Sequence, residues 1–212
     1  MNTFFNIFLT EFPQIPNAVA IPPSRLADYR SRLPKALLDF WMDVGWSGYG
    51  DGILWSTAPD VFDPVIEAWL GETNLLEENY TVIARNAFGE LYLWGRKTGM
   101  NVIIEPLLGT ITNFQSTLDE GREDSAMLAF FASKKQKSSD FYDWKDKPLF
   151  KKALKKLGPL QPDEMYGFEP ALAIGGTPKI ENLVKVKMIE HLILLSQLTE
   201  IELVHIDVRR PL

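Results

Sequence analysis

Side chains suited to catalysis are scarce in this chain, which has two histidines and no cysteine. His191 lies beside Glu190 in an apolar run with helical spacing, a setting in which a histidine is usually a partly exposed or core-edge residue. The sequence contains no HExxH, no GxSxG, no HxE with CxxC and no Asp-rich calcium loop. It therefore predicts no catalytic residue, no metal site and no cofactor, and so a protein that is not an enzyme.

Carboxylates are the one reactive group in good supply, with 28 Asp and Glu residues. Two carboxylates about 5–9 Å apart across a pocket are enough to hydrolyse a glycosidic bond. Asp163 and Glu164 are the first pair to test, although an acidic pair at a helix start is the commoner explanation. A carboxylate-dependent hydrolase therefore stays open as the least favoured of three functions.

Charge is distributed unevenly along the chain, whose net charge is −6. From Asp39 to Glu90 there are ten acidic residues and one base, Arg85, which gives −9; from Lys134 to Lys156 there are nine lysines and three aspartates, which gives +6. An acidic body opposes the continuous basic field that nucleic-acid binding needs, so no direct nucleic-acid partner is expected. The lysine run is typical of a solvated face. The acidic region is either plain surface or a patch that attracts a basic protein.

The composition is that of an ordinary globular protein, with 212 residues, 46% of them apolar and 24% charged. The N-terminal stretch lacks a positive start and a cleavage site and contains Glu11, so it does not resemble a signal peptide. No apolar stretch approaches the roughly 20 residues that span a bilayer. We expect a cytoplasmic protein without membrane contact; whether it is a monomer or a weak dimer stays open.

Three β-branched and aromatic runs give the clearest structural signal: Tyr80–Asn86, Leu91–Arg96 and Asn101–Glu105. Short, glycine-bearing connections join them, which predicts an antiparallel meander over residues 80–114 with Ile111–Phe114 as a fourth strand. Helices from both halves of the chain are predicted to cover this sheet, at residues 4–12, 24–44, 60–70, 120–131 and 147–157. Ser24 is the expected N-cap of the second, and Pro34 interrupts it.

The second half is predicted to be smaller and mixed. A strand is expected at Pro170–Ile174, a helix in the later part of 181–198, and a terminal strand at 201–208. The polar segment SKKQKSSD indicates a linker. We therefore predict an α+β fold, with domains at 1–132 and 145–212, a linker at 133–144, and the two domains packed as one body.

Several motifs in a fixed order resemble a known family. LPKALLDFWMDVGWSGYGDGILW, then AWL, then IARNAFGELYLW is similar to the GAD-like domain of bacterial type VI secretion loci. PLFKKALKKLGPLQPDEMYGFEPALAIGG followed by LVKVKMIEHLILLSQL resembles the C-terminal domain that accompanies it in immunity proteins for DNase effectors. The opening motif is also shared, more distantly, with the SMI1/KNR4-like group.

The resemblance implies a cytoplasmic immunity protein that binds and neutralises a cognate toxin, a DNase with a basic surface. A general binding or regulatory module of the SMI1/KNR4-like kind, without a toxin, is the alternative. The predicted contact uses an acidic stretch with aromatic anchors, and a contact in the C-terminal half instead stays equally open. The predicted contact residues are Trp46, Tyr49, Asp51, Trp55, Asp60, Asp63, Glu67, Glu72, Glu77 and Glu78.

Overall fold

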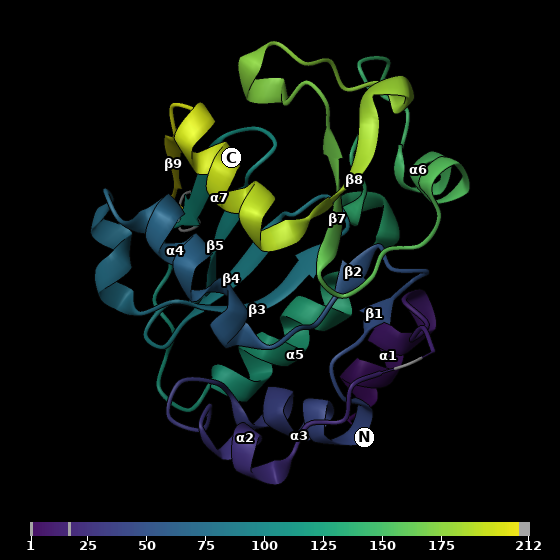
Figure 1. Cartoon of the computed structure of the whole chain (residues 1–212). Coiled ribbons are helices and arrows are strands. Elements are labelled where there is room, and N and C mark those ends of the chain that lie inside the picture. The colour runs from purple at the N-terminus through teal and green to yellow at the C-terminus, as the bar shows by residue number, and fades with distance from the viewer. Residues whose placement is uncertain (1, 17, 208–212) are drawn as a thin grey trace.

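The computed structural model describes residues 2–16 and 18–207, and it has the predicted α+β fold (Figure 1). Its centre is a seven-stranded sheet in the order β1-β2-β3-β4-β5-β6-β9, and β7 and β8 form a separate pair. Neighbours in the large sheet are antiparallel, except that β6 and β9 are parallel. The strands are β1 (Gly48–Tyr49), β2 (Leu54–Trp55), β3 (Thr81–Asn86), β4 (Leu91–Gly95), β5 (Gly99–Glu105), β6 (Thr110–Phe114), β7 (Glu164–Phe168), β8 (Leu183–Lys187) and β9 (Glu202–Ile206).

The predicted meander is confirmed over β3 to β6. Gly99 begins β5 and Gly109 precedes β6, and their φ angles of 73° and 71° are in the left-handed region that favours glycine. Every residue of β3 and β4 is buried. Continuous apolar runs are typical of strands covered on both faces, so the helices must flank this sheet on two sides.

One side is covered by α5 (Glu123–Ser133), on which α1 (Thr3–Glu11) and α3 (Lys35–Val44) pack (Figure 1). Phe5 stacks on Phe40 with ring centroids 4.0 Å apart, and Phe8 meets Phe131 edge-on at 5.1 Å. The phenylalanine spacing in the N-terminal sequence therefore marks the aromatic core of these helices. Phe4, the first residue of the helix predicted at 4–12, lies outside this core and is 48% exposed.

The predicted N-cap at Ser24 is wrong. Helix α2 (Pro23–Ala27) begins one residue earlier, with Pro22 as its N-cap. Proline suits a first helical position because its fixed φ is already helical and its missing N–H has no partner there to lose. The predicted break at Pro34 is confirmed, since Pro34 is the N-cap of α3.

The other side of the sheet carries α4 (Asp63–Leu70) and α7 (Met188–Leu198), which lie together in Figure 1. Trp69 is buried between them and donates from Nε1 to the Leu192 carbonyl at 2.9 Å. The 3-10 helices η1 (Pro59–Phe62) and η2 (Asn74–Glu78) flank α4. The hydrogen bond from Trp69 to Leu192 joins segments 123 residues apart in the chain.

The second half contains α6 (Phe150–Leu157), the β7–β8 pair, α7 and β9. The strand predicted at Pro170–Ile174 is wrong, because that segment ends in the 3-10 helix η4 (Leu172–Ile174) and η5 (Ile180–Asn182) follows. The strand lies earlier, at β7, where Tyr166 N donates to the Ala87 carbonyl at 2.9 Å. The terminal strand is confirmed as β9; residue 208, its predicted end, lies outside the described residues.

The polar segment 133–144 contacts both halves. It contains η3 (Gln136–Ser139), and the Ser139 carbonyl accepts a hydrogen bond from Asn86 Nδ2 at 3.2 Å. Asp140 Oδ1 accepts from the backbone N–H groups of Leu149 and Phe150 at 3.1 and 2.8 Å, which caps α6. The division into two domains at this segment stays a prediction.

Candidate interaction surface

Seven of the ten residues predicted to contact a partner fall into two groups in the structure, and Tyr49, Asp60 and Glu72 belong to neither. Four of them, Asp63, Glu67, Glu77 and Glu78, line one open depression. Trp46, Asp51 and Trp55 line a separate cleft. Since Val61 lines the cleft and Asp63 lines the depression, η1 and the start of α4 form a ridge between the two. We call these features the acidic depression, the apolar cleft and the ridge.

The acidic depression has a volume of about 690 Å³ and a mixed charge. Its four carboxylates share it with three cations, Arg32, Arg96 and Lys97. Glu78 Oε1 accepts from the backbone N–H of Lys97 at 2.7 Å, which fixes that carboxylate. Burial, and then the charge of Asp60, raise the pKa of Asp63. Glu72 is exposed just beyond α4, so three exposed carboxylates, those of Glu67, Glu72 and Glu77, follow one another along α4, the turn after it and η2.

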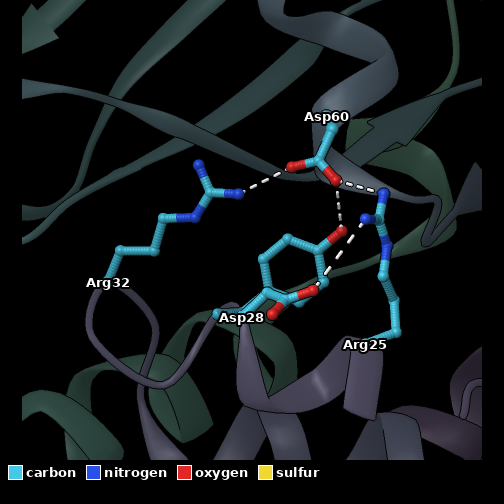
Figure 2. A network of polar contacts seen from close by, with 5 residues as sticks. Arg25, Asp28, Arg32 and Asp60 are labelled. Carbon is cyan, nitrogen blue, oxygen red and sulfur yellow. Dashed lines mark hydrogen bonds and ion pairs between the residues drawn. The ribbon is translucent and has the colours of Figure 1, made fainter.

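Asp60 is occupied by a polar network at the ridge (Figure 2). Arg25 and Arg32 approach its carboxylate from opposite sides, and Arg32 Nη2 donates at 2.6 Å. The Tyr29 hydroxyl donates to Oδ2 at 2.7 Å. Burial alone would raise the pKa of Asp60, but hydrogen bonds from Tyr29 and Arg32 and the nearby arginine charges lower it. Asp60 thus holds η1 against α2 and the turn that follows, and its charge is neutralised within the chain.

The apolar cleft has a volume of about 840 Å³ and is lined by segments that are distant in sequence. One wall is formed by Ile15, Pro16 and Val19 with residues drawn from 46–61, and the other by residues drawn from 154–163 with Met188 and Ile189. Val19 and Val61 are 53% and 47% exposed in it. Its lining includes two charged residues, Asp51 and Asp163, and no basic residue within the described chain.

Tyr49 and Trp55, two of the three predicted anchors, are 1% and 2% exposed. Trp55 Nε1 donates to the Gly52 carbonyl at 2.7 Å, and Tyr49 Oη lies 3.2 Å from Ser56 Oγ. Gly48 allows this close packing, because a Cβ there would lie 3.0 Å from the Trp55 ring. Tyr49 is therefore a core residue and Trp55 lines the cleft with almost no exposed surface, so Trp46 is the one predicted anchor that is partly exposed there.

Arg85, the single base of the acidic region, is fully buried behind Trp55. Its guanidinium carbon lies 4.8 Å from the centre of the Trp55 ring. Nη2 donates to the Pro162 carbonyl at 2.9 Å and Nη1 to the Asn86 carbonyl at 3.2 Å. Burial lowers the pKa of Arg85 to about 9, while the charge of Asp163 opposes that shift. Arg85 therefore ties strand β3 to the far wall of the cleft.

A third pocket, of about 360 Å³, brings three carboxylates together: Glu90, Glu105 and Asp140. Burial raises the pKa of all three, that of Glu90 to about 7. Glu90 Oε2 accepts from Asn86 Nδ2 at 2.7 Å and is attracted to the ammonium group of Lys134. Lys134 is an exception to the prediction of a solvated lysine run, because it is largely buried with Nζ 3.4 Å from the centre of the Tyr92 ring.

The carboxylates of Asp140, Asp163 and Glu164 already have partners within the fold. Asp140 caps α6, Asp163 pairs with Lys187, and Glu164 accepts from Gln161 N at 2.9 Å. Among residues 2–16 and 18–207, no group of three His, Cys, Asp or Glu side chains could hold a metal ion. These contacts give Asp140, Asp163 and Glu164 a role in the fold, which disfavours the hydrolase alternative.

Comparison with known proteins identifies the family. Residues 3–108, half of the chain, match the model of the GAD-like domain. This chain belongs to the GAD-like family. Residues 124–199 match the model of the C-terminal domain of the type VI secretion immunity protein Tdi1. The two matches, in this order along the chain, confirm the resemblance found in its motifs.

One solved structure resembles the GAD-like chain over nearly its whole length. It is the crystal structure of Atu4351 from Agrobacterium tumefaciens, with a TM-score of 0.88 and 22% sequence identity, over 98% of this chain and 94% of that one. At this identity the likeness shows a shared fold. No curated protein matches the chain in sequence. No helix within the described residues is long and apolar enough to cross a membrane.

The two surfaces of the GAD-like chain relate differently to the matched regions. The acidic depression lies wholly within the GAD-like region, whereas the apolar cleft has one wall from each region. Sequence reasoning missed the second wall, including Leu160, Pro162 and Met188. The signal was present, because LGPLQPDEM belongs to the family motif, but nothing local places this segment opposite Trp46 and Val61.

Proposed function

We propose that this chain is an immunity protein that neutralises a cognate type VI secretion toxin by stoichiometric binding in the cytoplasm of the cell that makes it. The observation that carries the proposal is the match of residues 124–199 to the C-terminal domain of the immunity protein Tdi1. An immunity protein acts by occupying its toxin, so the proposal gives this chain no reaction of its own.

We further propose that the toxin is a DNase. An enzyme that grips DNA needs a basic surface, because the phosphates supply most of the binding energy. The chain has a net charge of −6, and the carboxylates of Glu67, Glu72 and Glu77 are exposed along α4, the turn after it and η2. Complementary charge of this kind accelerates encounter between two proteins. The contact surface we propose therefore includes Asp63, Glu67, Glu72 and Glu77, with Trp46 and Asp51 across the ridge.

The first test is protection. Cells that express the product of the neighbouring gene should stop growing and lose intact chromosomal DNA, and co-expression of this chain should restore both. The two proteins should also co-purify in a fixed ratio. A neighbouring product that is harmless, or that kills equally with and without this chain, would favour the general binding module instead.

The second test concerns the acidic surface. Lysine substitutions at Glu67, Glu72 and Glu77 are expected to slow association with the toxin about tenfold at low salt and to flatten its dependence on ionic strength. Asp60 is left intact because its network holds the ridge. The matched control carries lysine at Glu120, Glu169 and Glu200, which are exposed and line neither surface.

Stopped-flow measurement of the association rate over a range of salt concentrations decides between these outcomes. If the triple variant associates at the wild-type rate, or if the control variant slows equally, the carboxylates of α4 and η2 are not a specific contact surface.

A further inference from the structure

Resting on the proposed function, we infer that the apolar cleft is the anchor site of the complex. The toxin inserts an apolar segment there and presents a lysine or arginine from that segment to Asp51 and Asp163. The acidic depression then guides the approach, while the cleft holds the bound partner. Because the ridge separates the two surfaces, one partner lying across it contacts both.

The size and composition of the cleft suit an inserted group of side chains. Its volume of about 840 Å³ is near the upper end of the roughly 300–1,000 Å³ found for ligand pockets. Its rim exposes Val19 and Val61, and Trp46 and Ile189 are partly exposed within it. A large exposed apolar surface on a soluble protein usually marks a binding site. Burial of these side chains would supply the central contact on which most interface energy depends.

The charges in the cleft specify the charge of the partner group that would bind there, which is positive. Asp51 is exposed, sits in a tight turn with φ 62° between Gly50 and Gly52, and makes no hydrogen bond or ion pair within the described residues. Asp163 forms an ion pair with Lys187, and its side chain remains 62% exposed. No basic residue is among the described lining. Lys187 and Arg85 offset part of the charge of Asp163, so a cation on the partner gains its attraction mainly from Asp51.

Both walls are fixed before any partner arrives. Arg85 joins β3 to the Pro162 carbonyl on the far wall, and Trp55 packs over its guanidinium group. On the near side, Asp60 holds η1 in place through Arg25 and Arg32. A rigid site loses little conformational entropy when it binds, which favours a firm anchor.

Two substitutions test the anchor site against matched controls. Val61→Arg places bulk and positive charge in the cleft, and Ile7→Arg makes the same change on α1 at a residue that is 48% exposed and outside both surfaces. Asp51→Asn removes one charge but keeps a residue that tolerates positive φ. With the product of the neighbouring gene as probe, Val61→Arg should weaken binding at least tenfold and Ile7→Arg less than twofold. Asp51→Asn should weaken it about threefold, with a smaller salt dependence.

Photo-crosslinking identifies the occupant directly. A benzophenone amino acid at position 61 should crosslink the wild-type complex to a toxin peptide that contains apolar residues and a Lys or Arg, and one at position 7 should not. Circular dichroism and thermal unfolding of each variant confirm that the fold is intact.

The outcomes separate the two proposals. If the wild-type chain does not bind the probe, both the proposed function and the anchor site fall. If it binds and protects while Val61→Arg and Asp51→Asn bind equally well, the function stands and the anchor site is wrong. Crosslinking from position 61 to a second copy of this chain, or to a small molecule of cellular origin, would also overturn the anchor site.

Discussion

Replacement of Arg85 by alanine is expected to lower the free energy of unfolding by about 3–5 kcal/mol. The substitution removes the guanidinium hydrogen bonds to the carbonyl of Pro162, at the wall of the cleft, and to that of Asn86, which is buried. It also opens a cavity behind Trp55, whose ring packs on the guanidinium group. Since domains are stable by only about 5–15 kcal/mol, the variant should be close to unfolding.

A methionine at the same position separates charge from volume. Arg85→Met fills much of the space and removes the buried charge, and replacing a buried ion with an apolar residue of similar volume is often tolerated. The Pro162 carbonyl still loses its guanidinium donor, and the Asn86 carbonyl keeps the Gly89 N–H at 3.4 Å as a donor, so a smaller loss of about 1–3 kcal/mol is expected. Arg96→Ala, at an exposed arginine, should change stability by less than about 0.5 kcal/mol.

Urea denaturation followed by tryptophan fluorescence measures all three variants. An alanine variant within about 1 kcal/mol of the wild type would show that water or rearrangement satisfies the Pro162 and Asn86 carbonyls. It would also remove Arg85 as the tie between the two walls of the cleft.

Arg85 also illustrates what the sequence could predict. The meander was predictable because β-branched runs and glycine connections act locally, over neighbours in the chain. The burial of Arg85 depends on Trp55 and Pro162, which are 30 and 77 residues away. One local signal existed: an arginine inside the otherwise apolar run VIARN is placed where its strand has no exposed face.

Strand pairing in the second half depended on distant partners. The segment Pro170–Ile174 contains aliphatic residues, which favoured a strand, but no neighbouring strand is available to pair with it. Residues 164–168 become β7 because β8 pairs along their length and Ala87 accepts from Tyr166. The parallel pairing of β9 with β6 likewise joins segments separated by most of the second half.

The candidate contact residues were chosen from acidic and aromatic composition, and composition does not reveal burial. Asp60 resembles its exposed neighbours in sequence, yet Arg25, Tyr29 and Arg32 surround it. Tyr49 and Trp55 stand among glycines, and those glycines allow the rings to pack inward. Asp51 is exposed and Trp46 is partly exposed, so both remain candidates for contact with a partner.

The stability of the chain is expected to increase as the pH falls from about 7 toward 4.5, because of Glu90. Burial raises the pKa of Glu90 from 4.5 to about 7, while the charge of Lys134 opposes the shift. The folded state therefore binds a proton in this range that the unfolded state does not, and stability is lost as the pH rises through the folded pKa. The shift corresponds to at most about 3–4 kcal/mol, at about 1.4 kcal/mol for each pKa unit.

Other groups titrate differently, so a matched variant is needed to isolate Glu90. Glu105 and Asp140 also have raised pKa values and act in the same direction, whereas the lowered pKa of His191 opposes them below about 6.5. The pKa of Lys134, lowered by burial to about 8, matters only above that pH. Glu90→Gln keeps an acceptor for Asn86 Nδ2 and removes the titration, so its stability should vary less with pH over this range than that of the wild type.

Urea denaturation of both proteins at several pH values between about 4.5 and 8 measures the difference. Glu105→Gln serves as the control, since Glu105 is only half buried and should flatten the profile less. Parallel profiles for wild type and Glu90→Gln would mean that Glu90 stays ionised against Lys134 throughout. The Glu90–Lys134 contact would then be an ion pair that stabilises the neutral-pH fold, and its removal would be costly at every pH tested.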